Sequence, residues 1–329
     1  MIRKILFILS ISMGYYSIAN AQALTKEELD HSDIYFLKKS GESVTVKDSA
    51  DYIRVISAPD TEVRNAYVVR DFYLNGKPKM TGRTLTPTVN LKRQGIFVEY
   101  FPNGSRKLIE SYNNGERTGE ASHYYPNGKL YYISSFDKDR RLTIISDARD
   151  STGIVTVTDG NGTLTLYDDD FKFISDRGAV VGGLREGEWR GIFRDSVKYV
   201  CLFKEGKGTS GTSYLPSGKV YEFSTAEIEP LPKGGIGEFY KFLATNIHYP
   251  AVAKMNNIQG KVFLTFTIEL DGKLTDVKIL RGIGSGCDEE AMRVISASPR
   301  WKPGYLYGIP VNVKYQVPIG FFLQQETVR

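Results

Sequence analysis

Few side chains in this 329-residue sequence have the types and spacing of a metal site. The three histidines, His31, His123 and His248, lie in separate segments, without the short spacing that metal ligands need. Asp168-Asp169-Asp170 lacks the glycine and the terminal glutamate of a calcium loop. We therefore expect surface histidines, a solvated acidic turn, no metal and no cofactor.

Catalytic patterns are equally weak. The sequence contains no G-x-S-x-G motif, no phosphate-binding loop and no pair of carboxylates that can be assigned to a cleft. The two cysteines, Cys201 and Cys287, lie in different predicted domains and are expected to be buried free thiols. A hydrolase built on the β-rich middle of the chain would need a triad that the sequence does not show, so an enzyme is the least favoured class.

The backbone of the last predicted strand, Ile309–Ile319, offers a different chemistry. Pro310 and Pro318 have the same parity, so their missing N–H groups lie along the same side of the strand, and that side must be a free sheet edge. Val311, Val313, Tyr315 and Val317 would pair inward. The residues predicted to present N–H and C=O groups outward are Asn312, Lys314 and Gln316. Such an edge is either a guarded edge or a docking site for an extended peptide.

The elements that position this strand are predicted from residue 260 onward. Apolar residues alternate over Lys261–Leu270, Asp271-Gly272 gives a hairpin signal, and a second strand follows over Leu274–Leu280. A helix begins near Cys287 and is closed by Pro299. Its buried stripe is Cys287, Ala291, Val294, Ile295 and Ser298. The pattern predicts a three-stranded sheet with a helix packed on one face.

Two further helices are expected before this sheet. Glu238–Asn246 has helical spacing of apolar residues and ends before Pro250, and a short helix is expected from Ala251 to about Met255. The Leu-Pro-Lys-Gly-Gly segment at 231–235 breaks the preceding pattern and marks a boundary. We assign residues 225–237 to a linker and residues 238–322 to the C-terminal domain.

A repeat organises the middle of the chain, over residues 66–224. Its copies each contain an aromatic strand end, a turn and a returning strand. They are Phe72-Tyr-Leu-Asn-Gly76, Tyr100-Phe-Pro-Asn-Gly104, Tyr124-Tyr-Pro-Asn-Gly128 and Tyr214-Leu-Pro-Ser-Gly218. The section from about 140 to 184 is interpreted as degenerate copies. A single hairpin is marginally stable, so neighbouring hairpins must stack into one antiparallel sheet.

The first residues have the pattern of an export signal. Arg3 and Lys4 precede an apolar run that ends in Ala19-Asn20-Ala21, so residues 1–21 are predicted to be a signal peptide, with the mature chain beginning near Gln22. An uncleaved inner-membrane anchor is the alternative. Residues 22–65 are predicted to be a β-rich segment. The formal charge of +5 includes Arg3 and Lys4, and such a mild imbalance does not favour a nucleic-acid partner.

Two family resemblances follow from these motifs. The Tyr124-Tyr-Pro-Asn-Gly128 unit and its copies resemble the MORN-type repeat in its bacterial variant, which implies an elongated, twisted antiparallel sheet and no particular chemistry. From about 231 to 322, the order Ile258-Gln-Gly260, Asp271-Gly272, Arg281-Gly-Ile-Gly284, Trp301-Lys-Pro-Gly304 and Gly308-Ile-Pro-Val311 resembles the C-terminal domain of TonB-type energy transducers. The expected fold is therefore mainly β: a repeat sheet followed by a TonB-like three-stranded sheet with packed helices.

The second resemblance implies partners and a location. Proteins of that family bind a short peptide, the TonB box, of outer-membrane receptors, and transmit energy from inner-membrane proton-channel proteins. It therefore implies a periplasmic or cell-envelope protein that binds receptor peptides by strand addition through Asn312, Lys314 and Gln316, and it leaves a homodimer open. The alternative is a non-energised envelope scaffold or adaptor that uses the repeat sheet. It is favoured by a departure from the family, because a signal peptide and a repeat sheet stand where the family has a membrane helix and a proline-rich spacer.

Overall fold

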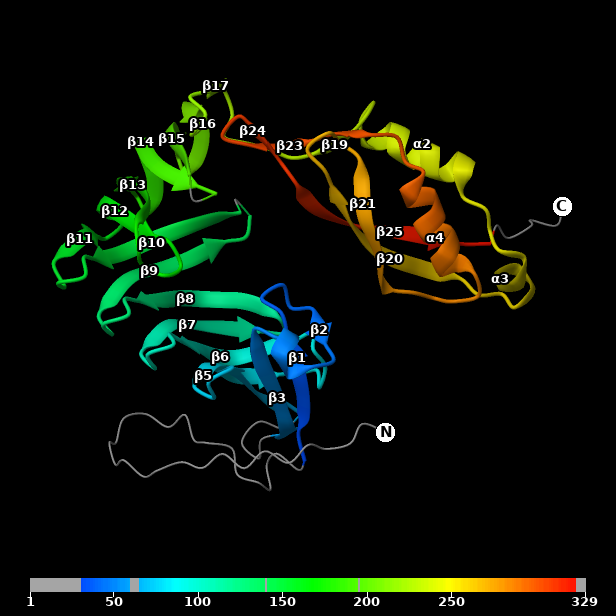
Figure 1. Cartoon of the computed structure of the whole chain (residues 1–329), viewed down its shortest axis with the longest axis horizontal. Coiled ribbons are helices and arrows are strands. Elements are labelled where there is room, and N and C mark those ends of the chain that lie inside the picture. The colour runs from blue at the N-terminus through cyan, green and yellow to red at the C-terminus, as the bar shows by residue number, and fades with distance from the viewer. Residues whose placement is uncertain (1–30, 60–64, 140, 195, 324–329) are drawn as a thin grey trace. The chain divides into compact units, whose positions relative to one another are not determined.

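The computed structural model describes residues 31–59, 65–139, 141–194 and 196–323. The expected signal peptide over residues 1–21 and the expected start at Gln22 lie outside these residues. The chain divides into two compact units, residues 1–130 and 131–329, so the predicted hairpins over 66–224 belong to both units. Strands dominate both units, and the described α-helices follow the hairpins near the C-terminus (Figure 1). The predicted mainly β fold with a C-terminal α+β part is confirmed.

The first unit is an antiparallel meander. β1 lies between β2 and β3, because Phe36 is paired with both Val44 and Ile53, and from β3 each strand pairs with the next one to β8. The strands are β1 (Asp33–Leu37), β2 (Ser43–Val44), β3 (Tyr52–Pro59), β4 (Tyr67–Tyr73), β5 (Pro78–Thr84), β6 (Arg93–Tyr100), β7 (Arg106–Asn113) and β8 (Glu116–Tyr124), with a 3-10 turn, η1 (Lys47–Ser49), before β3.

The second unit begins with another meander. Its strands again pair in chain order, so that each hairpin lies beside the one before it (Figure 1). The strands are β9 (Leu130–Asp137), β10 (Leu142–Arg149), β11 (Val155–Thr158), β12 (Asn161–Tyr167), β13 (Ile174–Val181), β14 (Leu184–Phe193), β15 (Val197–Lys204), β16 (Lys207–Tyr214) and β17 (Val220–Phe223). Residues 142–184 form strands of this meander, and their interpretation as degenerate repeat copies stays a prediction.

One turn recurs in the predicted repeat copies. The N–H of Gly76, Gly104, Gly128 and Gly218 donates to the carbonyl oxygen three residues earlier, at 2.8 to 2.9 Å. These glycines have φ between +82° and +94°, a left-handed conformation that glycine adopts without steric cost. Asparagine precedes three of these glycines and adds a hydrogen bond, as where Asn103 Oδ1 accepts from the N–H of Ser105 at 2.9 Å, whereas Ser217 precedes Gly218. The Asn-Gly signature therefore encodes a defined reversal, as the sequence predicts.

Glycines also allow aromatic rings to lie against the neighbouring strand. Gly178 is directly opposite Trp189, Gly191 opposite Tyr199 and Gly211 opposite Phe223. A Cβ at Gly191 or Gly211 would lie only 2.7 or 2.5 Å from the facing ring. The rings of Trp189 and Tyr199 are buried in the core of this meander, together with Cys201. A side chain at these glycines would displace the ring, so close approach of ring and backbone builds this core.

The C-terminal sheet follows the predicted order. It consists of β20 (Gly260–Ile268) between β21 (Leu274–Arg281) and β25 (Val313–Phe321), and α4 (Cys287–Ser296) packs on it (Figure 1). The two further helices are α2 (Ile236–Asn246), which begins two residues earlier than predicted, within the segment assigned to the linker, and α3 (Ala251–Met255). Four alternating residues of β20 and four stripe residues of α4 are completely buried: Val262, Leu264, Phe266, Ile268, Cys287, Ala291, Val294 and Ile295. The period-two and helical patterns therefore identified these core residues, whereas Ser298, the last residue of the predicted stripe, lies beyond the end of α4 and is only partly buried.

Short strands connect the second meander to this sheet. β18 (Glu227–Ile228) pairs with β23 (Gly304–Leu306), which also pairs with β24 (Ile309–Val311), and β19 (Leu231–Pro232) pairs with β22 (Trp301–Lys302). The prediction of one strand over Ile309–Ile319 is therefore wrong. A turn at Tyr307-Gly308 folds Ile309–Val311 back onto β23, so Pro310 is paired with Tyr305 and does not lie on the edge of β25.

The close approach of Gly178 and Trp189 gives a stability prediction. Gly178→Ala should lower the free energy of unfolding by about 1 to 3 kcal/mol, because the new methyl group overlaps the buried indole. Urea unfolding of the full chain measures the change. The control is Gly237→Ala in α2, where a Cβ meets no atom within 4 Å and alanine should instead favour the helix. Equal effects of the two substitutions would contradict the role assigned to Gly178.

Candidate peptide-docking edge

β25 is an edge strand with a regular register. It pairs with β20 over nine consecutive residue pairs, from Ile268 with Val313 to Gly260 with Phe321, without a bulge. In the described part of the chain, β20 is the one strand that pairs with it in this sheet. One side of its backbone is therefore not engaged by another strand.

Pro318 identifies the residues that face this open side. It is paired with Phe263 but has no N–H, so this pair belongs to the set that exchanges no backbone hydrogen bonds between the two strands. Lys314 and Gln316 have the same parity as Pro318, so their N–H and C=O groups point away from β20. Their side chains are exposed, whereas Val317 and Ile319 are buried. We call the outward backbone groups of Lys314 and Gln316 the free edge of β25.

The three predicted site residues thus fall in different places. Lys314 and Gln316 lie within β25, as expected. Asn312 is exposed but lies between β24 and β25, outside both strands. The free edge therefore begins with Lys314 and is limited by Pro318 alone.

The opposite edge of the sheet is irregular. β21 pairs with β20 through two register shifts, and Asp276 has φ +52°, which is unusual for a residue other than glycine. Asp276 and Lys278 form an exposed ion pair on this strand at 2.9 Å. Bulges and charges are the devices by which sheets block further pairing. The straighter edge, on β25, is the better template for an added strand.

Aromatic packing holds the middle of β25 in place. The ring of Tyr315 is 5.3 Å from that of Trp301 and 5.9 Å from that of Phe266, measured between centroids. Trp301 is 3% exposed and also contacts Phe239 of α2, at 5.1 Å. Trp301 thus belongs to the core of the C-terminal sheet and its helices. Because Tyr315 lies between Lys314 and Gln316, this packing also fixes the backbone on both sides of it.

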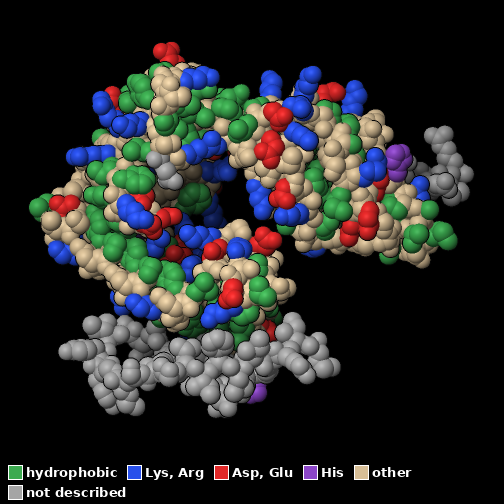
Figure 2. All heavy atoms as spheres, viewed as in Figure 1, with side chains coloured by type: hydrophobic (Ala, Val, Ile, Leu, Met, Phe, Trp, Pro, Cys, Tyr) green, Lys and Arg blue, Asp and Glu red, His purple; other side chains and the backbone are tan. Residues whose placement is uncertain are grey.

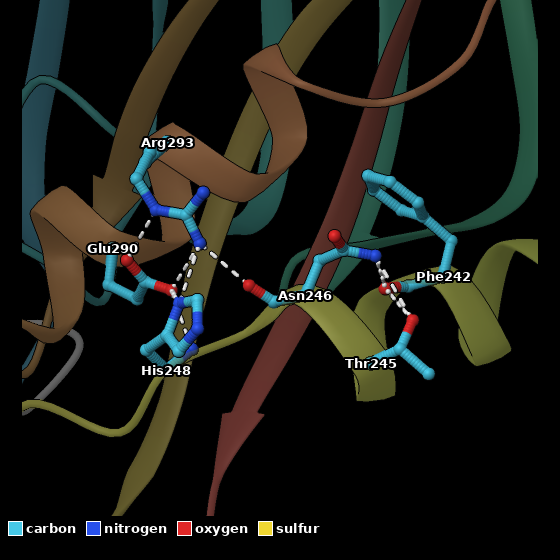
Figure 3. Close-up of polar contacts among 6 residues, drawn as sticks. All are labelled: Phe242, Thr245, Asn246, His248, Glu290 and Arg293. Atoms are coloured by element: carbon cyan, nitrogen blue, oxygen red, sulfur yellow. Dashed lines mark hydrogen bonds and ion pairs between the residues drawn. The ribbon is translucent and has the colours of Figure 1, made fainter.

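A charged cluster on α4 ties this helix to the end of α2 (Figure 3). Arg293 donates to both carboxylate oxygens of Glu290 at 2.7 Å and to the carbonyl oxygen of Asn246 at 2.6 Å. Glu290 also accepts from the backbone N–H of His248 at 2.6 Å. The hydrogen bonds from Arg293, with that of His248, hold the pKa of Glu290 down at about 2. Glu290 and Arg293 are three residues apart on a helix, a spacing that favours an ion pair, and this pair was not identified from the sequence.

The other candidate residues lie elsewhere in the described chain. His123, expected at the surface, is instead half-buried in β8, where burial lowers its pKa to about 4. Asp168 accepts hydrogen bonds from the N–H groups of Lys172 and Phe173, so it forms a turn. Cys201 and Cys287 are free and buried, and burial raises the pKa of the Cys201 thiol to about 11. Among the described residues, no group of three or more His, Cys, Asp or Glu side chains could hold a metal ion. Both signs of charge occur on the visible face of the molecule (Figure 2).

Comparisons with known proteins agree with this organisation. Residues 245–323 match the family described as Gram-negative bacterial TonB protein C-terminal, and residues 93–114 and 117–138 match the MORN repeat variant. The C-terminal part is thus similar to a TonB C-terminal domain, and strands before it match the MORN repeat variant.

Two curated relatives are similar to this chain, both named Protein TonB, from Helicobacter pylori strains J99 and 26695. Each is 28% identical over 116 residues, which cover 33% of this chain. The match spans 40% of the length of the first relative and 39% of the second. These relatives support a TonB-like protein. In the described residues, no helix has the length and apolar character needed to cross a membrane.

The charged cluster on α4 gives a pH prediction. Because the pKa of Glu290 is lowered in the folded state, its ionisation stabilises the fold fully above about pH 4.5, and this contribution is lost as the pH falls toward 2. Glu290→Gln should lower the local free energy of opening at pH 7 by about 1 to 3 kcal/mol and should weaken this acid dependence. Hydrogen exchange of peptides that contain residues 287–296, measured at pH 7 and near pH 3, tests both effects.

The matched control for this prediction is Glu289→Gln. Glu289 lies on the same helical turn and is exposed. It should change the exchange of α4 little, because it makes none of the hydrogen bonds that Glu290 makes to Arg293 and His248. If both variants altered the exchange of α4 equally, the cluster would not act as a tie between the helices.

Proposed function

We propose that this protein binds an extended peptide of an outer-membrane receptor along the free edge of β25, as an added strand, and so supports energised transport across the outer membrane. The observation that carries the proposal is the unbroken register of β25 with a partner on one side only. The match of residues 245–323 to the TonB C-terminal family supports the choice of a TonB-box peptide as the ligand.

The backbone chemistry of such binding is simple. Lys314 and Gln316 each offer one N–H and one C=O, so an added strand can form up to four main-chain hydrogen bonds with them. Each contributes about 0.5 to 1.5 kcal/mol net, so the peptide must gain the rest of its affinity from side chains. Pro318 lacks the next outward N–H and so interrupts the run of donors, which favours a short peptide paired with residues 314–316.

Energised transport requires more than this edge. We propose a periplasmic or envelope location and coupling to inner-membrane proton-channel proteins, supported by the family of the C-terminal part. The alternative is an envelope adaptor that binds receptors without using a proton gradient, and the MORN-variant repeats favour it because they supply a second large surface.

An experiment in cells distinguishes the two functions. A photoreactive residue at position 314 should crosslink to an outer-membrane receptor, whereas the same residue at exposed Lys273, in the β20–β21 turn, should not. For an energy transducer, uptake of the substrate of that receptor should depend on this protein and stop when a protonophore is added. Uptake that continues without the proton gradient would favour the adaptor.

The docking proposal predicts the effect of a proline at the free edge. Gln316→Pro removes one outward N–H at a position with the parity of Pro318, which the strand already tolerates. Binding of a synthetic TonB-box peptide, measured by calorimetry, should weaken about fivefold to tenfold, the equivalent of one lost hydrogen bond. Gln316→Ala, which keeps the N–H, is the control. Unchanged binding by a folded Gln316→Pro variant would exclude strand addition at this edge.

A further inference from the structure

The turn between β23 and β24 has an unusual sequence. Tyr307 and Gly308 form it alone, with φ +50° and +76°. Two-residue turns of this kind favour asparagine followed by glycine, because both positions need a left-handed backbone. A bulky aromatic residue in that conformation is an outlier. The local requirements of the turn therefore do not account for tyrosine at position 307.

The ring of Tyr307 packs into the second meander. It stacks on Tyr199 of β15, with a centroid separation of 3.9 Å and an angle of 14° between the ring planes. Phe193 of β14 and Phe223 of β17 lie 5.5 and 5.8 Å away. Three strands of the meander thus surround a side chain that belongs to the hairpin of the C-terminal part.

The backbone of Tyr307 is bound to the same region. Its N–H donates to the carbonyl oxygen of Ala226 at 2.6 Å, and its carbonyl oxygen accepts from Ser213 Oγ at 2.7 Å. Ser213 is completely buried. Both polar groups of this turn residue therefore have partners outside their own hairpin, which an ordinary exposed turn does not require.

The hydroxyl of Tyr307 is linked through the Tyr199 hydroxyl to a buried ion pair. It donates to the Tyr199 hydroxyl at 3.3 Å, and Tyr199 donates to Asp176 Oδ1 at 2.7 Å. Asp176 is 7% exposed and pairs with Arg185 at 2.6 Å, and the Arg185 guanidinium lies 4.2 Å from the centroid of the Trp189 ring. The hydroxyl group of Tyr199 is therefore held by the Asp176–Arg185 ion pair, which cannot easily rearrange.

We propose that Tyr307 is an anchor that locks the β23–β24 hairpin to the second meander, so that this meander and the three-stranded sheet move as one body. The pairing of β18 with β23 and of β19 with β22 reinforces the lock along the connecting segment. Because Asn312 alone separates β24 from β25, Tyr307 is also a positioning residue for β25. The lock does not depend on what the free edge of β25 binds.

The test distinguishes the effect of losing the Tyr307 ring from the effect of changing the turn itself. Tyr307→Asn gives the turn its preferred residue and keeps both backbone hydrogen bonds, but it removes the stacked ring. Spin labels are placed at Ser210→Cys and Ala244→Cys in the full-length chain. Both positions are exposed, one in the meander and one on α2, and the two native cysteines are buried. Pulsed electron resonance then measures the distribution of distances between the labels.

We expect one narrow distribution in the doubly labelled parent chain and in Tyr307→Phe, which keeps the ring. We expect a broad distribution in Tyr307→Asn, with amide exchange at residues 304–311 faster on the order of tenfold. A broad distribution in the parent chain would overturn the proposal without any variant. So would a folded Tyr307→Asn variant that stays as narrow as the parent.

Peptide binding is measured separately on the same samples. If the labels report a locked joint but no TonB-box peptide binds, the docking function fails and the anchor stands. If the peptide binds while the parent distribution is broad, the anchor fails and the docking function stands.

Discussion

Each strand needs hydrogen-bond partners for its backbone N–H and C=O groups, and the rest of the structure depends on this constraint. In both meanders the next strand along the chain satisfies one side of each strand, and short Asn-Gly turns make this pairing local. The C-terminal sheet has only three strands, so its two outer strands each have one side without a partner strand in this sheet. One is distorted by bulges in β21, whereas β25 stays regular. The difference between the two edges, rather than any single side chain, makes β25 the candidate site.

The packing beneath β25 explains why this edge stays regular. Trp301 and Phe266 hold Tyr315 from the core side, and α4 covers the same core with a stripe that is fully buried. Arg293 and Glu290 fix α4 against the end of α2. An edge strand supported in this way is already extended, so a peptide that adds to it orders only itself.

The second meander gives this protein a different construction from a domain on a proline-rich spacer. Proline-rich spacers act as semi-rigid rods, whereas the second meander has a packed core. Glycines that admit rings onto neighbouring strands make that core continuous through β13 to β17. If Tyr307 locks the joint, force applied to the second meander reaches β25 through folded structure. This would suit a protein that must transmit motion, and equally one that must present a partner in a fixed orientation.

The sequence by itself determined the local elements of this protein. Period-two and helical patterns located β20, β21 and α4, and the Asn-Gly turns located hairpins of the meanders. The outward assignment of Lys314 and Gln316 was argued from Pro310 and Pro318 together, and only Pro318 lies in β25. These features depend on neighbours within a few positions of one another, which periodicity records.

Only the tertiary structure decided where β25 begins. Ile309–Val311 had the alternation of a strand, but its partner was the adjacent β23, so Pro310 and Asn312 left the predicted edge. The partner of Tyr307 is Tyr199, 108 residues earlier in the chain. A contact over that separation leaves no periodic trace in the sequence. It is fixed by the fold, which brings three meander strands and a hairpin from the end of the chain together.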